Sequence, residues 1–227
     1  EVPAINTNEV RGESLLSQLK RWKATYGYEK FNLIGHSQGS PTARYITGVA
    51  PELVASVTSV GGVNGGTAVA DAGLLLGVGI YGNPLGAFIT ALAGNVSLTS
   101  MTGALTSLST LGASRFSSKF PLGKPTSTCG DGPAEANGIR FYSATGSSVA
   151  TNVADVSDAV ILAVSVSLIG QQSDGLVGRC ATHWGVTLKD NYRWNHLDEV
   201  NQVAGLRGLL SEDPVAFYRT HANRLKN

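Results

Sequence analysis

The hydrophobic pattern in the first part of the chain alternates between helical and strand-like periods. In residues 6–26, apolar side chains recur every three or four positions, which predicts an amphipathic helix that ends at Gly27. The short apolar run 31–34 then predicts a buried strand. A second helix follows directly, because Pro41 is tolerated in a first helical turn and Pro51 ends the pattern.

Later segments continue this alternation. Residues 53–60 predict another strand, and the glycine-rich run 61–66 predicts the loop after it. Nearer the C-terminus, the patterns predict a strand at 139–142 and helices at 156–168 and 214–225. Strands that alternate with helices in this way favour an α/β fold, with a mostly parallel central sheet flanked by helices.

One uncharged stretch has about the length that a bilayer requires. Residues 72–94 carry no charged side chain, which raises the question of a transmembrane helix. Glycine, asparagine and proline interrupt the middle of the stretch between residues 77 and 86, and this argues against a membrane span. We expect a mobile apolar cover here, in a protein that is not integral to a membrane.

Charge and composition narrow the class of protein further. The 227 residues include 17 Lys and Arg against 16 Asp and Glu, with no basic run to neutralise a row of phosphates, so we expect no nucleic-acid partner. The length suits a single domain over residues 1–227. No leader-like segment follows Glu1, so any targeting segment is expected to have been removed or to lie outside this sequence.

The most informative motif is G-x-S-x-G at residues 35–39, between a predicted strand and a predicted helix. Such a turn places a serine side chain at a helix N-terminus, where backbone N–H groups and the helix dipole stabilise a developing oxyanion. We therefore interpret Ser37 as a nucleophile. The alternative is an ordinary glycine and serine turn.

A serine nucleophile requires a base, and the chain has four histidines. His36 adjoins the nucleophile on the turn and is expected to pack or cap, whereas His221 on the last helix is expected to be a surface or core residue. His183 and His196 both follow a candidate acid in the sequence, so either gives the order nucleophile, acid, base along the chain that serine hydrolases with an α/β fold use. We favour His196, because it lies in the polar loop 191–198.

The acid that orients this base is expected to be Asp174, whose Asp-Gly turn at residues 173–178 follows an apolar segment. Asp155, Asp158 and Asp190 are the competing carboxylates. The alternative for Asp174 is an Asx-turn with no catalytic role.

Two further features leave alternatives open. Asp198 either caps a short helix or, with an oxygen donor from a distant part of the chain, holds a hard cation such as calcium. Cys129 and Cys180 lack the spacing of zinc or thioredoxin-type sites, so a single disulfide is the remaining possibility for them.

Several of these motifs together resemble the secreted, foldase-dependent triacylglycerol lipases of the Pseudomonas and Burkholderia kind, which are α/β-hydrolases. The resemblance extends over essentially the whole chain. It rests on the strings at residues 9–13, 32–39, 173–178, 190–193, 195–202 and 221–227.

The resemblance implies a catalytic triad of Ser37, Asp174 and His196, the three residues already favoured. It also implies structural calcium, bound by the carboxylates of Asp155 and Asp198 and by the backbone carbonyls of Gln202 and Leu206.

The family pairs the cysteines that correspond to Cys129 and Cys180, and such a disulfide fits a protein secreted through the periplasm to the extracellular space. Residues 79–103 resemble the family's lid, which moves aside at an oil–water interface. A lipase-specific foldase is the implied partner during folding.

The sequence departs from the family pattern at its start. In the family, a strand, a His-Gly loop, a helix and another strand precede the string at residues 9–13. We therefore expect the sequence to be N-terminally incomplete. The backbone N–H of Gln38 is then one oxyanion donor, and the second donor is absent from the sequence.

The function implied is hydrolysis of long-chain triacylglycerol esters through an acyl-enzyme, by an extracellular lipase. One alternative is a carboxylesterase or acyltransferase that uses the same triad. Another is an inactive fragment that binds acyl ligands or the foldase. A role as a structural surface protein does not account for a serine, an acid and a histidine that occur in this order along the chain.

Overall fold

The structure is a computed structural model that describes residues 1–76, 89–90, 94 and 97–226. Its centre is a sheet in which β1 (Phe31–His36), β2 (Val54–Val60), β4 (Ile139–Gly146) and β5 (Val186–Tyr192) pair in parallel, in that order. The short β3 (Glu135–Ala136) pairs antiparallel with the start of β4. The predicted α/β architecture is therefore confirmed.

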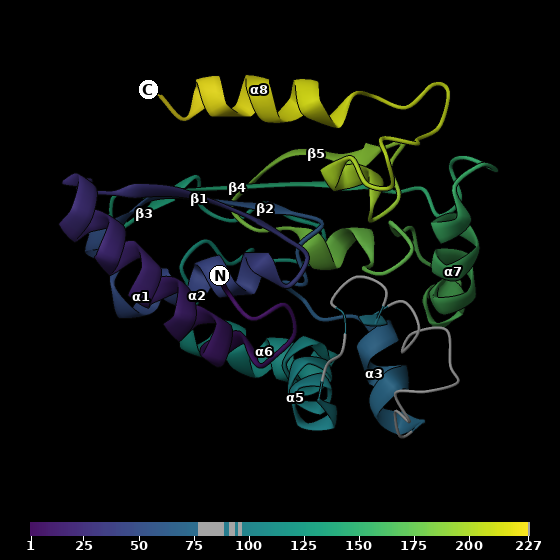
Figure 1. Cartoon of the computed structure of the whole chain (residues 1–227), viewed down its shortest axis with the longest axis horizontal. Coiled ribbons are helices and arrows are strands. Elements are labelled where there is room, and N and C mark those ends of the chain that lie inside the picture. Colours follow the sequence, from purple (N-terminus) through teal and green to yellow (C-terminus); the bar gives the residue numbers. More distant parts are fainter. Residues whose placement is uncertain (77–88, 91–93, 95–96, 227) are drawn as a thin grey trace.

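Helices cover both faces of this sheet. Figure 1 shows α1 and α2 on one face and α8 on the other, with α3 and α7 towards one end. Among the described residues, no helix is long and apolar enough to cross a bilayer. Within the described part of the chain, the helices with defined bounds are α1 (Asn8–Tyr26), α2 (Gly39–Val49), α3 (Ala68–Leu75), α5 (Leu98–Leu108), α6 (Thr110–Lys119), α7 (Val156–Val164) and α8 (Pro214–Arg224).

Local chemistry sets the ends of the predicted helices. Thr7 caps α1 because its side chain accepts a hydrogen bond from the backbone N–H of Val10, and Gly27 ends it in the left-handed conformation. Asp213 caps α8 in the same way, next to a proline in the first turn. These ends lie within two residues of the predicted ones.

Other boundaries differ from the prediction. The strand at 31–34 continues to His36, and the strand at 139–142 continues to Gly146. The apolar segment 156–168 divides into α7 and a 3-10 turn at Ser165–Leu168. Of the predicted lid at 79–103, most residues lie outside the described part of the chain, and residues 98–103 form the start of α5.

The main core lies between the sheet and the pair α1 and α2. Burial of apolar side chains there holds the strand that precedes the candidate nucleophile against both helices. Its buried residues include Leu16, Leu19, Leu33, Ile46, Val54, Val57 and Phe141.

A disulfide joins Cys129 to Cys180, as the resemblance implies. The two α-carbons lie 4.4 Å apart, and the bond closes a loop with a sequence separation of 51. In the chain-entropy model, closing a loop of this length stabilises the folded state by about 4 kcal/mol. The bond fixes the segment that leads from the acidic turn to β5.

Candidate active site

The candidate nucleophile lies on a tight turn between β1 and α2. Ser37 has φ of 54°, a left-handed conformation that costs free energy in a residue other than glycine. A Cβ atom on Gly35 would lie 2.3 Å from the backbone of Gly39, so only glycine allows this approach, whereas a Cβ on Gly39 itself would meet nothing within 4 Å. The motif therefore requires its first glycine for close packing.

The candidate base and acid form a direct hydrogen bond. His196 Nδ1 lies 2.8 Å from Asp174 Oδ2, and both side chains are buried. Since the carboxylate accepts, we place the ring proton on Nδ1, which leaves Nε2 with a lone pair for a substrate or nucleophile proton. Burial acts to lower the pKa of His196, but the charge of Asp174, the hydrogen bond to it and the charge of Glu199 leave that pKa above its usual value.

Asp174 also makes the Asx-type turn that was the alternative interpretation. Its Oδ1 accepts hydrogen bonds from the backbone N–H groups of Leu176 at 2.9 Å and Val177 at 2.8 Å. One carboxylate oxygen thus fixes the turn while the other faces His196. The turn chemistry orients the acid.

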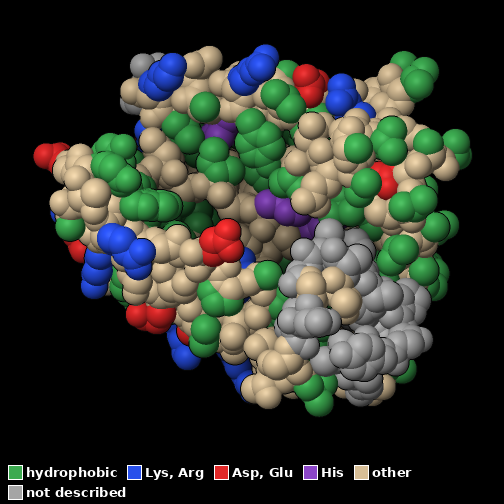
Figure 2. All heavy atoms as spheres, in the orientation of Figure 1, with side chains coloured by type: hydrophobic (Ala, Val, Ile, Leu, Met, Phe, Trp, Pro, Cys, Tyr) green, Lys and Arg blue, Asp and Glu red, His purple; other side chains and the backbone are tan. Residues whose placement is uncertain are grey.

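Ser37, Gln38 and His196 line the same cavity, which has a volume of about 320 Å³. These residues follow strands β1 and β5, so they meet at the carboxyl edge of the parallel sheet, where α/β folds place their ligands. Figure 2 shows histidine side chains in a hollow of this face. The cavity wall is mainly apolar, with Val63, Val69, Ile89, Leu105, Leu108, Leu176 and Val177.

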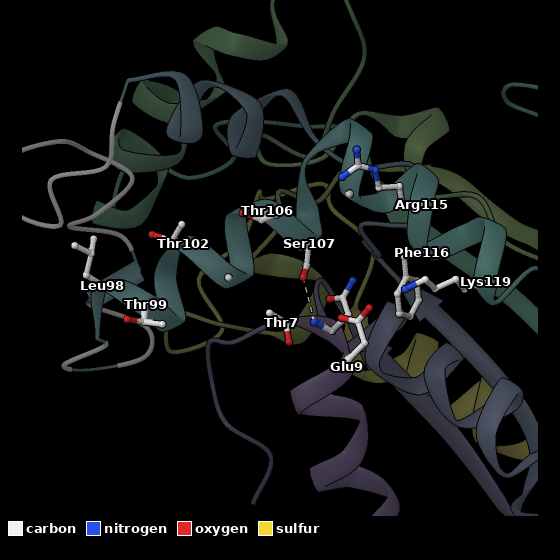
Figure 3. A pocket seen from close by; sticks show the side chains of 13 residues that line it. Thr7, Glu9, Leu98, Thr99, Thr102, Thr106, Ser107, Arg115, Phe116 and Lys119 are labelled. Atoms are coloured by element: carbon white, nitrogen blue, oxygen red, sulfur yellow. Dashed lines mark hydrogen bonds between the residues drawn. The ribbon is translucent and has the colours of Figure 1, made fainter.

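A second and larger cavity, of about 650 Å³, lies between the start of α1 and helices α5 and α6. Figure 3 shows hydroxyl side chains along one side of it, with Glu9, Arg115 and Lys119. None of the predicted catalytic residues lines it. The candidate chemistry therefore lies in the smaller, apolar cavity.

The other histidines make different contacts. His36 packs on the base, with ring centroids 4.5 Å apart, as predicted for a residue beside the nucleophile. His183 Nε2 lies 3.0 Å from Asp190 Oδ2, so these two rejected candidates pair with each other. His221 is buried against Thr58, and burial together with nearby arginine charges lowers its pKa to about 4.

The other competing acids have structural contacts. Asp158 accepts hydrogen bonds from the backbone of Asn152 at 2.7 Å and from the side chain of Asn195 at 2.6 Å. Asp155 caps α7 through its Oδ1, which accepts from the backbone of Ser157 at 2.8 Å. Among the described residues, only Asp174 of the four candidate acids forms a hydrogen bond with His196.

Three buried carboxylate oxygens lack hydrogen-bond partners within the described residues: Oδ2 of Asp155, Oδ1 of Asp198 and Oε2 of Glu199. The first two belong to residues that the resemblance assigns to calcium. Burial raises the pKa of Asp198 to about 6, and the charges of Asp158 and Asp155 act in the same direction. Buried oxygens without a donor fit a hard cation, because such a cation prefers carboxylate and carbonyl ligands.

The remaining predicted ligands follow in the same loop. Asp198 does not cap a helix: it begins the 3-10 turn Asp198–Val200, and its Oδ2 accepts from the backbone of Asn195 at 3.1 Å. Gln202 folds back on this turn, with its N–H donating to the carbonyl of Leu197 at 3.1 Å, and Leu206 lies four residues further on.

Sequence reasoning missed Asn195 and Glu199. Asn195 Oδ1 accepts from the backbone of Leu197 and Asp198, both at 2.9 Å, and so organises the turn after His196. Glu199 is completely buried beside the same turn. The only signal in the sequence was the density of polar residues in a short loop near the candidate base.

Fold and site together define a class of protein. A serine on a strained strand-to-helix turn shares its cavity with a histidine that is hydrogen-bonded to an aspartate, at the edge of a parallel sheet. This is the arrangement of α/β-type hydrolases. Residues 3–120 match the model of the alpha/beta hydrolase fold family, and the chain belongs to this family.

Curated relatives of the chain are triacylglycerol lipases. The chain is 45% identical to one from Vibrio cholerae, over 100% of this chain and 75% of the relative. It is 37% identical to one from Pseudomonas fragi, over 99% of this chain and 83% of the relative. It is also 37% identical to one from Burkholderia plantarii, over 95% of this chain and 71% of the relative. These relationships place the chain among the carboxylic ester hydrolases.

Solved structures support the fold. The mature lipase BlEst2 of Bacillus licheniformis aligns with a TM-score of 0.66 at 14% identity, over 97% of this chain and 75% of that one. The metagenomic carboxyl esterase MGS0156 aligns with a TM-score of 0.62 at 18% identity, over 100% of this chain and 64% of the esterase. At these identities the likeness is one of architecture.

Proposed function

We propose that the protein is a lipase that hydrolyses long-chain triacylglycerols through an acyl-enzyme. The observation that carries this proposal is the 2.8 Å hydrogen bond between His196 and Asp174, in a buried pair beside a cavity that Ser37 also lines. The named activity of the curated relatives supports the same reaction.

In the proposed reaction, His196 Nε2 takes the hydroxyl proton of Ser37 while the serine oxygen attacks the ester carbonyl. Asp174 stabilises the imidazolium, and the backbone N–H of Gln38 donates to the oxyanion. His196 then gives its proton to the departing alcohol oxygen. Water, activated by the same base, releases the fatty acid.

The substrate class follows from the cavity wall. Its aliphatic side chains suit an acyl chain, since each buried CH₂ contributes about 0.8 kcal/mol. A water-insoluble ester at an oil–water interface is therefore the proposed substrate.

Activity against emulsified trioleoylglycerol, compared with a soluble short-chain nitrophenyl ester, tests this proposal. We expect release of oleate from the emulsion, measured by titration at constant pH. Turnover of the soluble ester alone would identify a carboxylesterase, and transfer to an added alcohol in preference to water would identify an acyltransferase. No turnover of either substrate would favour the acyl- or foldase-binding fragment.

We further propose that the carboxylates of Asp155 and Asp198, with the carbonyl oxygens of Gln202 and Leu206, hold structural calcium. The buried Oδ2 of Asp155 and Oδ1 of Asp198, which have no hydrogen-bond partner within the described residues, support this assignment. When bound, calcium neutralises these carboxylates and ties the segment before α7 to the loop that carries His196.

Removal of calcium is expected to lower the melting temperature. A ligand at 100 times its dissociation constant stabilises the folded state by about 2.7 kcal/mol, so a shift of several degrees is expected on chelation. Hydrogen exchange should increase first at residues 195–206. Asp198→Asn should abolish the difference between calcium and chelator, and equal melting of the unaltered protein in both would contradict the proposal.

Export through the periplasm to the extracellular space is also proposed, with a lipase-specific foldase as the folding partner. The disulfide between Cys129 and Cys180 supports an oxidising destination. The foldase follows from the resemblance to foldase-dependent lipases.

A further inference from the structure

A second buried carboxylate lies beside the candidate catalytic turn. Glu199 is completely buried, and its Oε1 accepts hydrogen bonds from the N–H of Gly146 at 2.7 Å and the hydroxyl of Thr145 at 3.1 Å. Its Oε2 lies 3.2 Å from Nε2 of His36. One oxygen thus anchors the side chain at the end of β4, while the other faces the nucleophile turn.

His36 links this carboxylate to the backbone of the candidate base. As the last residue of β1, it directly precedes Ser37. Its Nε2 lies 2.9 Å from the carbonyl oxygen of His196 as well as 3.2 Å from Glu199 Oε2. Because a carbonyl oxygen only accepts, Nε2 carries the proton and donates to the carbonyl of His196. Glu199 Oε2 lies beside the same nitrogen and has no hydrogen-bond partner within the described residues.

The backbone that follows β2 also packs closely against the Glu199 carboxylate. A Cβ atom on Gly61 would lie 1.8 Å from Glu199 Oε2, so the backbone here fits the carboxylate only without a side chain. The N–H of Gly61 donates to Ala144 in β4 at 2.9 Å. Residues at the carboxyl ends of β1, β2 and β4 therefore all lie close to Glu199.

We propose that His36 and Glu199 form a positioning pair, which holds the main chain of His196 in register with the turn that carries Ser37. The inference rests on the proposed function and assigns neither residue a contact with substrate. Its physical basis is the sensitivity of catalysis to geometry, since a misplacement of about 1 Å lowers the rate by about 10²-fold.

A metal site is the competing interpretation, since ligand atoms of His36, His196 and Glu199 lie within 4.8 Å of one another. The hydrogen bonds argue against it. His36 Nε2 already donates to the carbonyl of His196, and His196 Nδ1 already faces Asp174. A metal there would displace both bonds, so the paired arrangement is the one that the contacts favour.

Variants at His36 test the pair. His36→Phe keeps a ring and removes the donor, whereas His36→Gln keeps an N–H near the position of Nε2. With calcium present and a soluble ester as substrate, we expect His36→Phe to lower kcat by about 10- to 100-fold with KM within about twofold. His36→Gln should recover most of kcat, which a merely structural role would not predict.

Glu199→Gln provides the second half of the test. An amide of nearly equal size has only one acceptor oxygen. If that oxygen keeps the bonds to Thr145 and Gly146, a donor faces His36, so we expect a similar loss of kcat. The combination with His36→Phe should be no worse than about the poorer single variant, because coupled residues are not additive.

A matched control comes from another buried histidine contact. Thr58→Val removes the 2.6 Å hydrogen bond to His221 and is expected to lower the melting temperature while leaving kcat unchanged. A folded His36→Phe protein with wild-type kcat would overturn the positioning pair alone. An unaltered protein with no esterase activity and no serine labelling would instead overturn the proposed function.

Discussion

Replacing Ser37 with alanine is expected to abolish ester hydrolysis, with kcat falling about a million-fold, the scale measured for triad serines. The serine lies on the strained turn, where its φ of 54° fixes the side chain at the edge of the cavity. Neither His196 nor the Gln38 N–H can form the acyl-enzyme without this oxygen. Initial rates on a soluble ester, normalised to folded protein, measure the loss.

The matched control for this variant is Ser118→Ala. Ser118 lies near the end of α6 and is exposed, with its hydroxyl donating to Ser114 at 3.0 Å. Wild-type activity is expected for the control. If Ser37→Ala kept more than about a hundredth of the wild-type rate, a different nucleophile would have to be sought.

Asp174→Asn is expected to lower kcat about ten-thousand-fold while leaving the fold intact. The amide oxygen can keep the hydrogen bonds from Leu176 and Val177, so the turn persists. The amide NH₂ then faces His196 Nδ1, which favours the wrong tautomer and leaves no lone pair on Nε2 for the serine proton. Steady-state kinetics, with circular dichroism to verify folding, measure the effect.

Asp190→Asn is the control that separates the two candidate acids. Asp190 pairs with His183 at 3.0 Å and with Arg179 at 2.7 Å, in contacts that do not involve His196. We expect its kcat to stay within about threefold of wild type, as is usual for residues without a contact to the catalytic groups. The reverse pattern, with Asp190→Asn inactive and Asp174→Asn active, would reassign the acid.

The parts of this fold that the sequence predicted are those with local chemical signals. The first helix has a capping threonine and a terminal glycine, and the nucleophile turn has a glycine at Gly35 that its close packing requires. Strand β5 was missed, because Lys189, Asp190 and Asn191 interrupt its apolar pattern. The position of β5 depends on its pairing with β4, which lies far away in the sequence, so the residues around β5 alone do not reveal it.

In the candidate site, too, some residues had a local signal in the sequence and others did not. Sequence order narrowed the base and the acid to a few residues, and the loop context and the family resemblance favoured His196 and Asp174 among them. The 2.8 Å contact between these two side chains agrees with that prediction. Apart from the polar character of its loop, Glu199 gave no local signal, because its neighbours Gly146 and His36 come from strands far away in the sequence.

Intact mass before and after treatment with a long-chain alkyl phosphonate tests whether Ser37 is an activated nucleophile beside an acyl-binding cavity. The reagent forms a stable bond only with an activated nucleophile, and its chain probes the apolar cavity at the same time. We expect a single adduct on the calcium-loaded protein and none on Ser37→Ala. No adduct on the folded protein, or an adduct that persists in Ser37→Ala, would contradict it.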